Sequence, residues 1–448
     1  MTAPTKTIRT PAETGIIERF GKAELPGSPA VRDARAKAFA AFERQGLPNR
    51  RVEEWKYSDL RARLKQAPAL TLRPSDEAAK AALVAHEDAF AGLDRYRLVL
   101  VDGFFVPSLS DADALAAEGI RVSSFAEAVA GADARDLLAV PVIADDIALS
   151  LNTAFAADGV VVTIPKGQGP SRPLHILHVA TGSSASAVYA RSRVVIGDGV
   201  EATVLESALG GANGSEINLA TDYSIGRDAR VTIAGLQAED ADTTHIGSTI
   251  VTVDGNSEVK LLGVTAGSSF ARNQTFLTFA GQHARAQVLG VGMVHGTRHV
   301  DNTLVVDHAV PHCTSAELFK TVVDDRGTGV FQGKIFVRQD AQKTAGKMMS
   351  QGLLLSEEAE MHSKPELEIY ADDVICGHGA TVAQIDATSL FYLMARGIPR
   401  AEAEQLLIEA FLDSALDALE NEAVTAGLRG VVSAWLGRRN ATREAKAA

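Results

Sequence analysis

Cysteine is scarce in this chain, because Cys313 and Cys376 are the only two among 448 residues. Two cysteines cannot build a disulfide framework, so a hydrophobic core must stabilise the fold, and a reducing compartment fits best. The sequence also lacks the run of about 18 apolar residues that a membrane-spanning helix needs, and residues 1–20 contain no apolar leader. We therefore expect a cytoplasmic protein that does not bind a membrane.

Positive charge is the next shortage, because 56 acidic side chains outnumber 44 basic ones and give a formal net charge of −12. A chain that works mainly on nucleic acid needs a basic surface to displace the counterions of the phosphates. We therefore expect no nucleic-acid partner. The sequence also has no glycine-rich phosphate-binding loop that ends in Lys-Ser or Lys-Thr, so the chain itself is not expected to hydrolyse ATP.

Residues 1–180 mix helix and strand signals and predict an α/β region. Pro29–Gln45 combines good helix formers with apolar residues at helical spacing, and Ser28 and Gly46 are suited to its two ends. Residues 97–106 (RLVLVDGFFV) predict two short strands that are joined by an Asp-Gly turn.

Residues 181–385 consist of short runs rich in Val, Ile, Leu and Thr, each interrupted by Gly, Asp or Asn. Aligning the interruptions gives repeat units that start 29, 28, 26 and 27 residues apart, at Val194, Tyr223, Val251, Leu277 and Leu304. Each unit reads as strand, polar turn and strand, which suits one coil of a β-solenoid. One coil cannot bury its apolar face alone, so coils must stack about 4.8 Å apart around a shared core. A sandwich or barrel is the competing fold, and the regular spacing favours the solenoid.

Residues 386–448 predict a helical region. After Pro399, apolar residues recur at helical spacing and leave acidic residues on the other side. The predicted fold class is therefore mainly β, with a solenoid core between an N-terminal α/β region and C-terminal helices.

The candidate ligands for a metal gather late in the chain. His308, His312 and Cys313 lie within six residues, and Cys376 and His378 are two residues apart. Thiolate and imidazole both bind iron or zinc, but neither segment has the spacing of a two-part zinc motif. A zinc site formed by the first three residues stays open as an alternative. So does a purely structural role, with cysteines in the core and histidines in turns.

Cys376 and His378 would share one face of a strand, because alternate residues of a strand point the same way. Joint coordination of a metal or thiol–imidazole chemistry is then sterically possible. The glycines on either side, Gly377 and Gly379, would allow a ligand or a partner backbone to come close. The alternative is a bend that leads out of the solenoid, for which glycines are also suited.

Two acidic pairs, Asp324-Asp325 and Asp372-Asp373, raise the alternative of a carbohydrate-active β-helix enzyme. Such an enzyme needs two carboxyl groups that face each other across the scissile bond. Adjacent strand residues point to opposite faces, so each pair is a poor dyad. Aromatic residues make up 5% of the chain, which leaves few surfaces for sugar stacking. The pattern therefore disfavours this alternative.

Four motifs occur in order between Asp307 and Pro399: GVFQGKI, AQKT, KPELEIYADDV and CGHGAT. Together with RVEEWKYSDL at 51–60 and LVLVDGFFVPSLS at 98–110, this pattern resembles the SufB/SufD family of iron–sulfur cluster assembly proteins over most of the chain. The GHGAT motif at 377–381 and the EEWKYSDL segment favour the SufD branch of the family. The SufB branch has more cysteines and is the alternative.

The resemblance implies a right-handed parallel β-helix between N- and C-terminal helical domains, which agrees with the repeat. It implies a non-catalytic scaffold subunit of the SufBCD complex, which pairs with SufB through the β-helix and with the ATPase SufC through the C-terminal helices. The candidate SufC contacts are Ile398, Pro399, Ala403, Leu406, Leu407 and Phe411.

The resemblance also assigns a site. His378 matches the family histidine that is implicated in forming the nascent cluster between SufB and SufD, so it is the candidate iron–sulfur ligand. Cys376 is either a helper or a structural residue. The isolated chain is expected to hold no cofactor stably, because the iron–sulfur cluster would be transient and would form at the interface with SufB.

Overall fold

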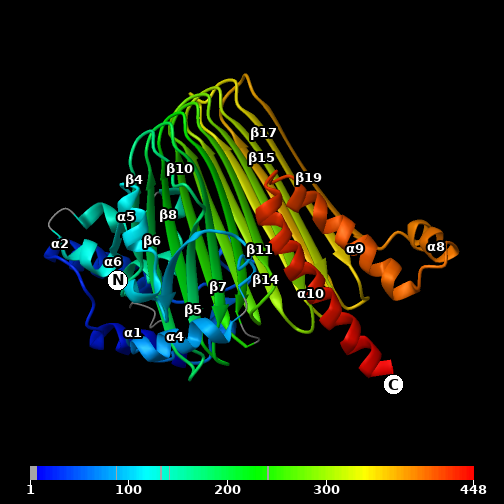
Figure 1. Ribbon diagram of the computed structural model, residues 1–448, viewed down its shortest axis with the longest axis horizontal. Coiled ribbons are helices and arrows are strands. Elements are labelled where there is room, and N and C mark those ends of the chain that lie inside the picture. Colours follow the sequence, from blue (N-terminus) through cyan, green and yellow to red (C-terminus); the bar gives the residue numbers. More distant parts are fainter. Residues whose placement is uncertain (1–7, 87, 132–133, 141, 240–241, 448) are drawn as a thin grey trace, which may run out of the picture.

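The computed structural model describes residues 8–86, 88–131, 134–140, 142–239 and 242–447. Two large sheets face each other and form a β-solenoid of about eight coils (Figure 1). Each coil contributes one strand to each sheet, and strands of neighbouring coils pair in parallel. The mainly β fold class and the solenoid that the repeat predicts are therefore confirmed.

Within the described residues, one sheet has ten strands in the order β19-β17-β15-β13-β11-β9-β7-β5-β1-β2. Its strands are β1 (Tyr96–Val101), β2 (Phe104–Phe105), β5 (Leu174–Ala180), β7 (Glu201–Gly210), β9 (Arg230–Glu239), β11 (Glu258–Thr265), β13 (Arg285–Val294), β15 (Thr314–Val323), β17 (Ala345–Leu354) and β19 (Ile375–Gln384).

The other sheet has nine strands in the described chain, in the order β18-β16-β14-β12-β10-β8-β6-β4-β3. Its strands are β3 (Arg121–Ser124), β4 (Val160–Ile164), β6 (Ala187–Ile196), β8 (Glu216–Ile225), β10 (Thr244–Val253), β12 (Phe270–Phe279), β14 (His299–His308), β16 (Thr328–Val337) and β18 (Glu360–Ile369).

The helices lie before and after the solenoid strands or between the first of them. The α-helices are α1 (Pro11–Lys22), α2 (Pro29–Gln45), α3 (Leu60–Arg63), α4 (Asp76–Ala85), α5 (Ala112–Ala117), α6 (Phe125–Ala130), α7 (Ile147–Phe155), α8 (Ala387–Ala395), α9 (Arg400–Asp417) and α10 (Glu422–Ala447). Short 3₁₀ helices are η1 (Glu53–Trp55), η2 (Pro107–Leu109), η3 (Ala134–Leu138) and η4 (Val142–Ala144). No described helix is both long enough and apolar enough to cross a membrane.

The predicted repeat can be compared with the strand register residue by residue. Val194, Tyr223, Val251 and Leu277 lie one above the other in neighbouring coils, as predicted. The next residue in this column is Val306, so the predicted start of the fifth unit is wrong by two residues. A shift of two leaves the inward and outward faces unchanged, and the apolar pattern therefore does not reveal it.

The inward-facing residues of both sheets form the main hydrophobic core. All five residues of this column belong to it, and they are buried together with inward residues of the opposite sheet. Since each coil places an equivalent residue at the same position, the core continues along the whole length of the solenoid.

Helices α1, α2 and α7 of the N-terminal region cover the outer face of the nine-stranded sheet, whereas α4 packs on β1 and β5 of the ten-stranded sheet. Helix α2 spans the predicted residues and ends at Gly46, and α1, α2 and α7 pack their apolar sides together against β6. The predicted hairpin is also present as β1 and β2, with Asp102 and Gly103 at positive φ in the turn. Because β1 pairs with β5, this region is joined directly to the solenoid.

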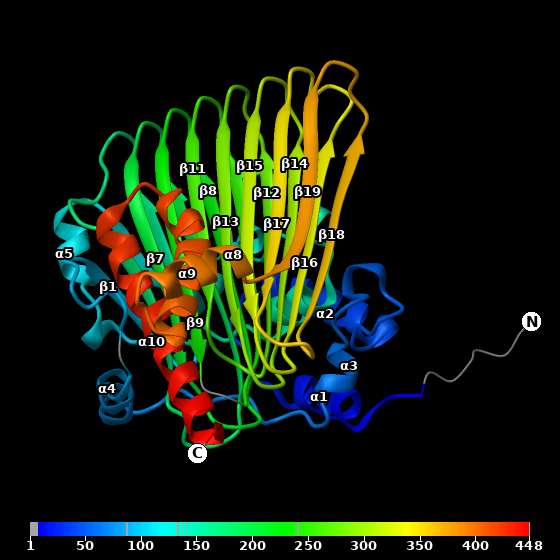
Figure 2. The ribbon, with the colours of Figure 1, turned by 90° about the vertical axis from the view of Figure 1, so that its right-hand side faces the viewer.

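The C-terminal helices α9 and α10 cover the outer face of the ten-stranded sheet (Figure 2). Ile408, Leu412 and Leu416 of α9 are fully buried against outward-facing leucines and valines of the middle strands. Parallel sheets are normally covered on both faces in this way. β19 ends at Gln384 and α8 begins at Ala387, while the predicted domain limits at residues 180 and 385 stay predictions.

The two ends of the solenoid differ. At the first end, Leu115 of α5 and Ile120 are buried in the main core and close it. At the other end, β18 and β19 are the last strands of their sheets (Figure 2). All of their residues are exposed or half-buried. We call this the open end, defined by β18 and β19.

Two glycines in neighbouring coils allow a test of how tightly the solenoid interior is packed. Gly263 and Gly290 are partners in neighbouring strands. A Cβ atom at Gly290 would lie 2.2 Å from the Phe319 ring, whereas a Cβ at Gly263 would meet nothing within 4 Å. We expect Gly290→Ala to lower the free energy of unfolding by about 1–3 kcal/mol through overpacking, and Gly263→Ala to have little effect. Urea unfolding curves that are equal for the two variants would contradict this packing.

Candidate functional site at the open end of the solenoid

Cys376 and His378 both lie on β19, which confirms the predicted strand. The register pairs Cys376 with Gly346 and His378 with Met348. Met348 belongs to the main core, so this column of residues faces the inside of the solenoid. The two candidate residues are therefore inward-facing neighbours on the last strand of their sheet.

The position of β19 determines how exposed each side chain is. Cys376 is half-buried and packs against the main core, whereas His378 is exposed. An inward-facing residue is normally covered by the next coil, and β19 has no further strand beyond it in the described chain. His378 is consequently an imidazole at the rim of the core that a second molecule can reach.

Glu317 lies deeper in the same column, because it pairs with Met348 and Met348 pairs with His378. The side chain is buried, and neither carboxyl oxygen has a hydrogen-bond partner among the described residues. Burial raises the pKa of Glu317 to about 8, against a smaller opposite effect of the Ser315 hydroxyl. Burial also raises the pKa of the Cys376 thiol, and the Glu317 carboxyl adds to that effect.

His308 adds a buried imidazole to this inward-facing group. Its Nε2 lies 3.0 Å from the Ser315 hydroxyl, while its Nδ1 is buried without a partner in the described chain. Burial lowers the pKa of His308 to about 4, so the ring is neutral at physiological pH. The sequence pattern did not single out Glu317 or Ser315.

The three residues of the predicted zinc site point to different places. His308 faces the interior beside Ser315, and Cys313 is buried in the main core. His312 is exposed on a turn and stacks on His283, with 4.8 Å between the ring centroids. No three His, Cys, Asp or Glu side chains stand together as a metal site within the described ranges.

The acidic pairs are engaged in ion pairs. Asp324 is buried and binds Arg439 of α10, with 2.5 Å between the carboxyl oxygen and Nε. Asp373 forms an ion pair with Lys343. Each pair therefore contributes a carboxylate that is already neutralised by a basic side chain, which gives the carbohydrate-active alternative no support.

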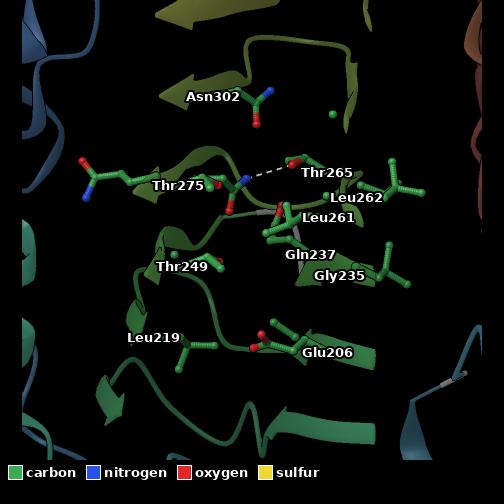
Figure 3. A pocket seen from close by; sticks show the side chains of 18 of the residues that line it. Glu206, Leu219, Gly235, Gln237, Thr249, Leu261, Leu262, Thr265, Thr275 and Asn302 are labelled. Carbon is green, nitrogen blue, oxygen red and sulfur yellow. Dashed lines mark hydrogen bonds between the residues drawn. The ribbon is translucent and has the colours of Figure 1, made fainter. Parts of the chain in front are cut away.

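A cavity with both apolar and polar residues in its lining lies between the two sheets in the middle coils (Figure 3). It has a volume of about 120 Å³ and is lined by residues of both sheets, among them Glu206, Thr249 and Thr275. The half-buried Glu206 accepts hydrogen bonds from Thr221 Oγ1 at 2.9 Å and from the Tyr223 hydroxyl at 2.5 Å. Such a cavity has room for several water molecules. Its carboxylate is satisfied, unlike that of Glu317.

The EEWKYS segment of the N-terminal region crosses the outer face of the nine-stranded sheet. Ser58 is fully buried and hydrogen-bonds to both His299 and Asp301. Asp301 also forms a buried ion pair with Arg272, whose guanidinium lies 4.0 Å from the Trp55 ring centroid. Because Arg272 and Ser58 both bind the aspartate, the histidine does not stand between serine and aspartate as in a hydrolase triad. This cluster attaches the segment to the solenoid.

The candidate contacts on the C-terminal helices differ in exposure. Ala403 is fully buried and offers no surface to a partner, and Phe411 packs against the solenoid, with Lys320 Nζ 4.4 Å from its ring centroid. Leu406 is exposed, Pro399 is exposed, and Ile398 and Leu407 are half-buried. Sequence reasoning missed the exposed apolar residues of α8, which are Phe391, Tyr392 and Met394.

Comparison with known proteins gives a consistent result. The family model "SUF system FeS cluster assembly, SufBD core domain" matches residues 178–411, and the model "SufBD protein N-terminal region" matches residues 23–176. The chain is 30% identical to the iron–sulfur cluster assembly protein SufD of Escherichia coli, over 88% of this chain and 90% of that protein. It is 29% identical to a SufBD family protein of Synechocystis, over 86% and 87%, and 27% identical to SufD of Bacillus subtilis, over 63% and 65%.

The fold and the site define a β-solenoid protein that is closed at one end and carries inward-facing thiol and imidazole groups at its open end. Both family models fall on this architecture, one from β5 to the middle of α9 and the other from just before α2 into β5. The chain belongs to the SufBD family of the SUF iron–sulfur cluster assembly system and is a SufD-type member of it.

Proposed function

We propose that this chain is a scaffold subunit, without catalytic activity of its own, for iron–sulfur cluster assembly. It pairs with SufB through the open end of its solenoid and binds the ATPase SufC through its C-terminal helices. The observation that carries the proposal is the open end itself, where His378 lies beside two strand edges that have no neighbour in the described chain.

The open end has the properties of a docking surface for another solenoid. An exposed strand edge presents unpaired backbone groups, and proteins normally protect such an edge with charge, proline or a covering element. Here β18 carries Lys364, Pro365 and Glu366, whereas β19 contains no Asp, Glu, Lys, Arg or Pro. The two strands and the turn between them also expose apolar side chains, which are Ile369, Tyr370, Ile375 and Val382. Addition of a strand from a partner would pair the free backbone groups and bury these side chains together.

Helix α8 supports the second contact. Phe391 is 73% exposed, and Tyr392 and Met394 are also exposed on this nine-residue helix. Aromatic residues and methionine are enriched in protein interfaces, so an exposed group of them favours a protein partner. Leu406 and Pro399 extend this surface onto the start of α9. We therefore assign the SufC contact to α8 and the exposed residues of α9.

The iron–sulfur cluster is the cargo of this site. His378 supplies an imidazole at the rim, and Cys376 supplies a thiol behind it. Iron–sulfur clusters need about four protein ligands in total, so the two groups of this chain form an incomplete set that the partner must complete. We therefore expect the isolated chain to hold no cluster stably.

Co-purification of this chain with its SufB- and SufC-type partners tests the proposal. We expect Val382→Glu to break the contact with SufB, because it places a charge on β19, which contains no Asp, Glu, Lys or Arg, while SufC remains bound. Val84→Glu is the matched control, because Val84 is exposed on α4, which lies far along the chain from the open end. Failure of the wild-type chain to form a complex with SufB would refute the proposal, and equal retention of SufB by both variants would exclude the open end as the contact.

A further inference from the structure

A groove runs along the last helix of the chain. It has a volume of about 740 Å³, within the range of about 300–1,000 Å³ that is typical of small-molecule sites. One wall is α10, which crosses the outer face of the ten-stranded sheet (Figure 2). The other wall follows the carboxyl ends of β7, β9, β11, β13 and β15, together with the loop after α4. None of its described lining residues belongs to β18 or β19, so the groove is separate from the open end.

The wall on α10 carries small side chains over most of its length. The lining residues at every fourth position are Ala426, Gly430 and Ala434, followed by Arg438. Residues four apart lie on the same side of a helix, so the small side chains form one continuous stretch that leads to the arginine. A Cβ atom on Gly430 would meet nothing within 4 Å, which shows that the space beside it is open.

The opposite wall is apolar in its middle part. Leu236 and Ala266 are buried residues of neighbouring coils, and Val431 of α10 packs into the same hydrophobic cluster. All three still contribute to the lining of the groove. An apolar body that lies on them loses contact with water, and this loss favours its binding.

Two arginines, Arg298 and Arg438, stand at the end of the groove beside β13. Burial lowers the pKa of Arg298, and the positive charge of Arg438 adds to this effect. Arg298 Nη1 lies 3.2 Å from Nδ1 of His295, whose ring is neutral at physiological pH because burial lowers its pKa to about 4. Arg298 forms no ion pair with a carboxylate in the described part of the chain. Two guanidinium groups that repel each other are stabilised by an anion between them.

The acidic side chains of the groove do not supply that anion, because they are engaged elsewhere. Their partners are Arg95 for Asp88, Arg439 for Asp324, His245 for Glu239 and the backbone amide of Gly296 for Asp325. The groove therefore combines an apolar middle part with a basic end whose arginine Arg298 has no acidic partner among the described residues.

We propose that this groove binds a small amphipathic anion, whose carboxylate or phosphate group lies between Arg298 and Arg438 and whose apolar body lies along α10. Guanidinium groups bind both kinds of head group through paired hydrogen bonds, so the common chemistry is one anionic group on an apolar body. The helical rise from Gly430 to Arg438 is about 12 Å, which accommodates an alkyl chain of medium length. The inference does not depend on the proposed function, because it uses neither the open end nor α8.

Isothermal titration calorimetry of the full-length chain with octyl phosphate and with decanoate tests the inference, and the two ligands distinguish the two head groups. We expect saturable binding of at least one of them. Inorganic phosphate lacks the apolar body and octyl glucoside lacks the charge, so both should bind more weakly. Arg298→Gln should weaken binding by about tenfold or more, because a hydrogen bond to a charged group has an effect on this scale.

Gly430→Leu and Gly437→Leu form a matched pair of variants. Both glycines lie on α10 and a Cβ atom on either would meet nothing within 4 Å, but of the two Gly430 lines the groove. Leucine is a better helix former than glycine, so neither substitution should weaken the helix. We expect Gly430→Leu to abolish binding because the leucine fills the groove, and Gly437→Leu to bind like the wild type.

The inference is overturned if neither octyl phosphate nor decanoate binds the wild-type chain saturably, or if Arg298→Gln or Gly430→Leu binds as tightly as the wild type. Loss of binding in Gly437→Leu would also overturn it, because the ligand would then lie outside the groove. Equal affinity for inorganic phosphate and octyl phosphate would exclude the apolar contact. Co-purification with SufB and SufC is a separate measurement, and a wild-type chain that binds the anion but neither partner refutes the proposed function alone.

Discussion

In the complex of this chain with its SufB and SufC partners, we expect His378→Ala to lower the iron and acid-labile sulfide that the complex accumulates by about tenfold or more. His378 is exposed on the last strand of the solenoid, where it can supply a ligand to a cluster that forms between two subunits. On β19 itself, the half-buried Cys376 is the other thiol or imidazole side chain besides His378, so this strand has one such group left when the histidine is removed.

The control for this experiment is His312→Ala. His312 is also an exposed histidine, but it lies on a turn and stacks on His283 rather than facing the interior. Both variants should still bind SufB and SufC, because a single imidazole contributes little to a large interface. If His378→Ala complexes accumulate as much iron and sulfide as His312→Ala complexes, then His378 has no role in assembly.

We expect Asp301→Ala to lower the free energy of unfolding by about 3–5 kcal/mol, which is the usual effect of removing one partner of a buried ion pair. The side chains of Arg272 and Asp301 are 1% and 0% exposed, and the substitution leaves the guanidinium buried without its carboxylate. Ser58 loses a hydrogen-bond acceptor at the same time. The EEWKYS segment should therefore become accessible to proteases.

Chemical unfolding and limited proteolysis measure these two effects. Asp94→Ala is the control, because Asp94 forms an exposed ion pair with Arg172 that should contribute less than about 1 kcal/mol. Replacement of Arg272 and Asp301 together by Met and Leu should recover part of the loss, since no unpaired charge then remains. Equal stability of the Asp301→Ala and Asp94→Ala variants would mean that the buried pair does not anchor the segment.

The solenoid could be predicted from the sequence because its coils repeat at a nearly constant length. The column of Val194, Tyr223, Val251 and Leu277 was recoverable from the positions of the polar turns. The fifth unit was not, because Leu304 and Val306 face the same side and only the hydrogen-bond register distinguishes them.

The inward position of Glu317 could not be predicted, and the reason lies in the burial of the sheet on both faces. In β15 the inward residues include Glu317 and Phe319, while the outward residues include Leu318 and Val322, which pack under the C-terminal helices. Apolar residues therefore occur at both the odd and the even positions of the strand. The alternation of apolar and polar residues then does not show which side of the strand faces the core. The prediction that Cys376 and His378 share one face of a strand did not depend on knowing which face is inward.

The C-terminal helix illustrates a similar ambiguity. Apolar residues surround much of α9, so the sequence pattern allows more than one buried stripe. Of the residues on α9 that sequence analysis assigned to the SufC contact, Leu406 is exposed and Ala403 is fully buried. Ile408 and Leu412, which were not in that set, are also fully buried. Which stripe is buried depends on where the helix docks on the solenoid, and this contact is remote in sequence.

Each coil of the solenoid contacts only the coils next to it, so the solenoid behaves as a linear array of coils. One end of this array is closed by α5, and the other end, at β18 and β19, is free. A unit inside the array is held from two sides, whereas β18 and β19 are held from one. Amide hydrogen exchange should therefore be slowest in the middle strands and fastest at the free terminus. A molecule that binds at this terminus as a further unit protects the last coils from local opening. Its binding free energy is therefore coupled to the ordering of these coils.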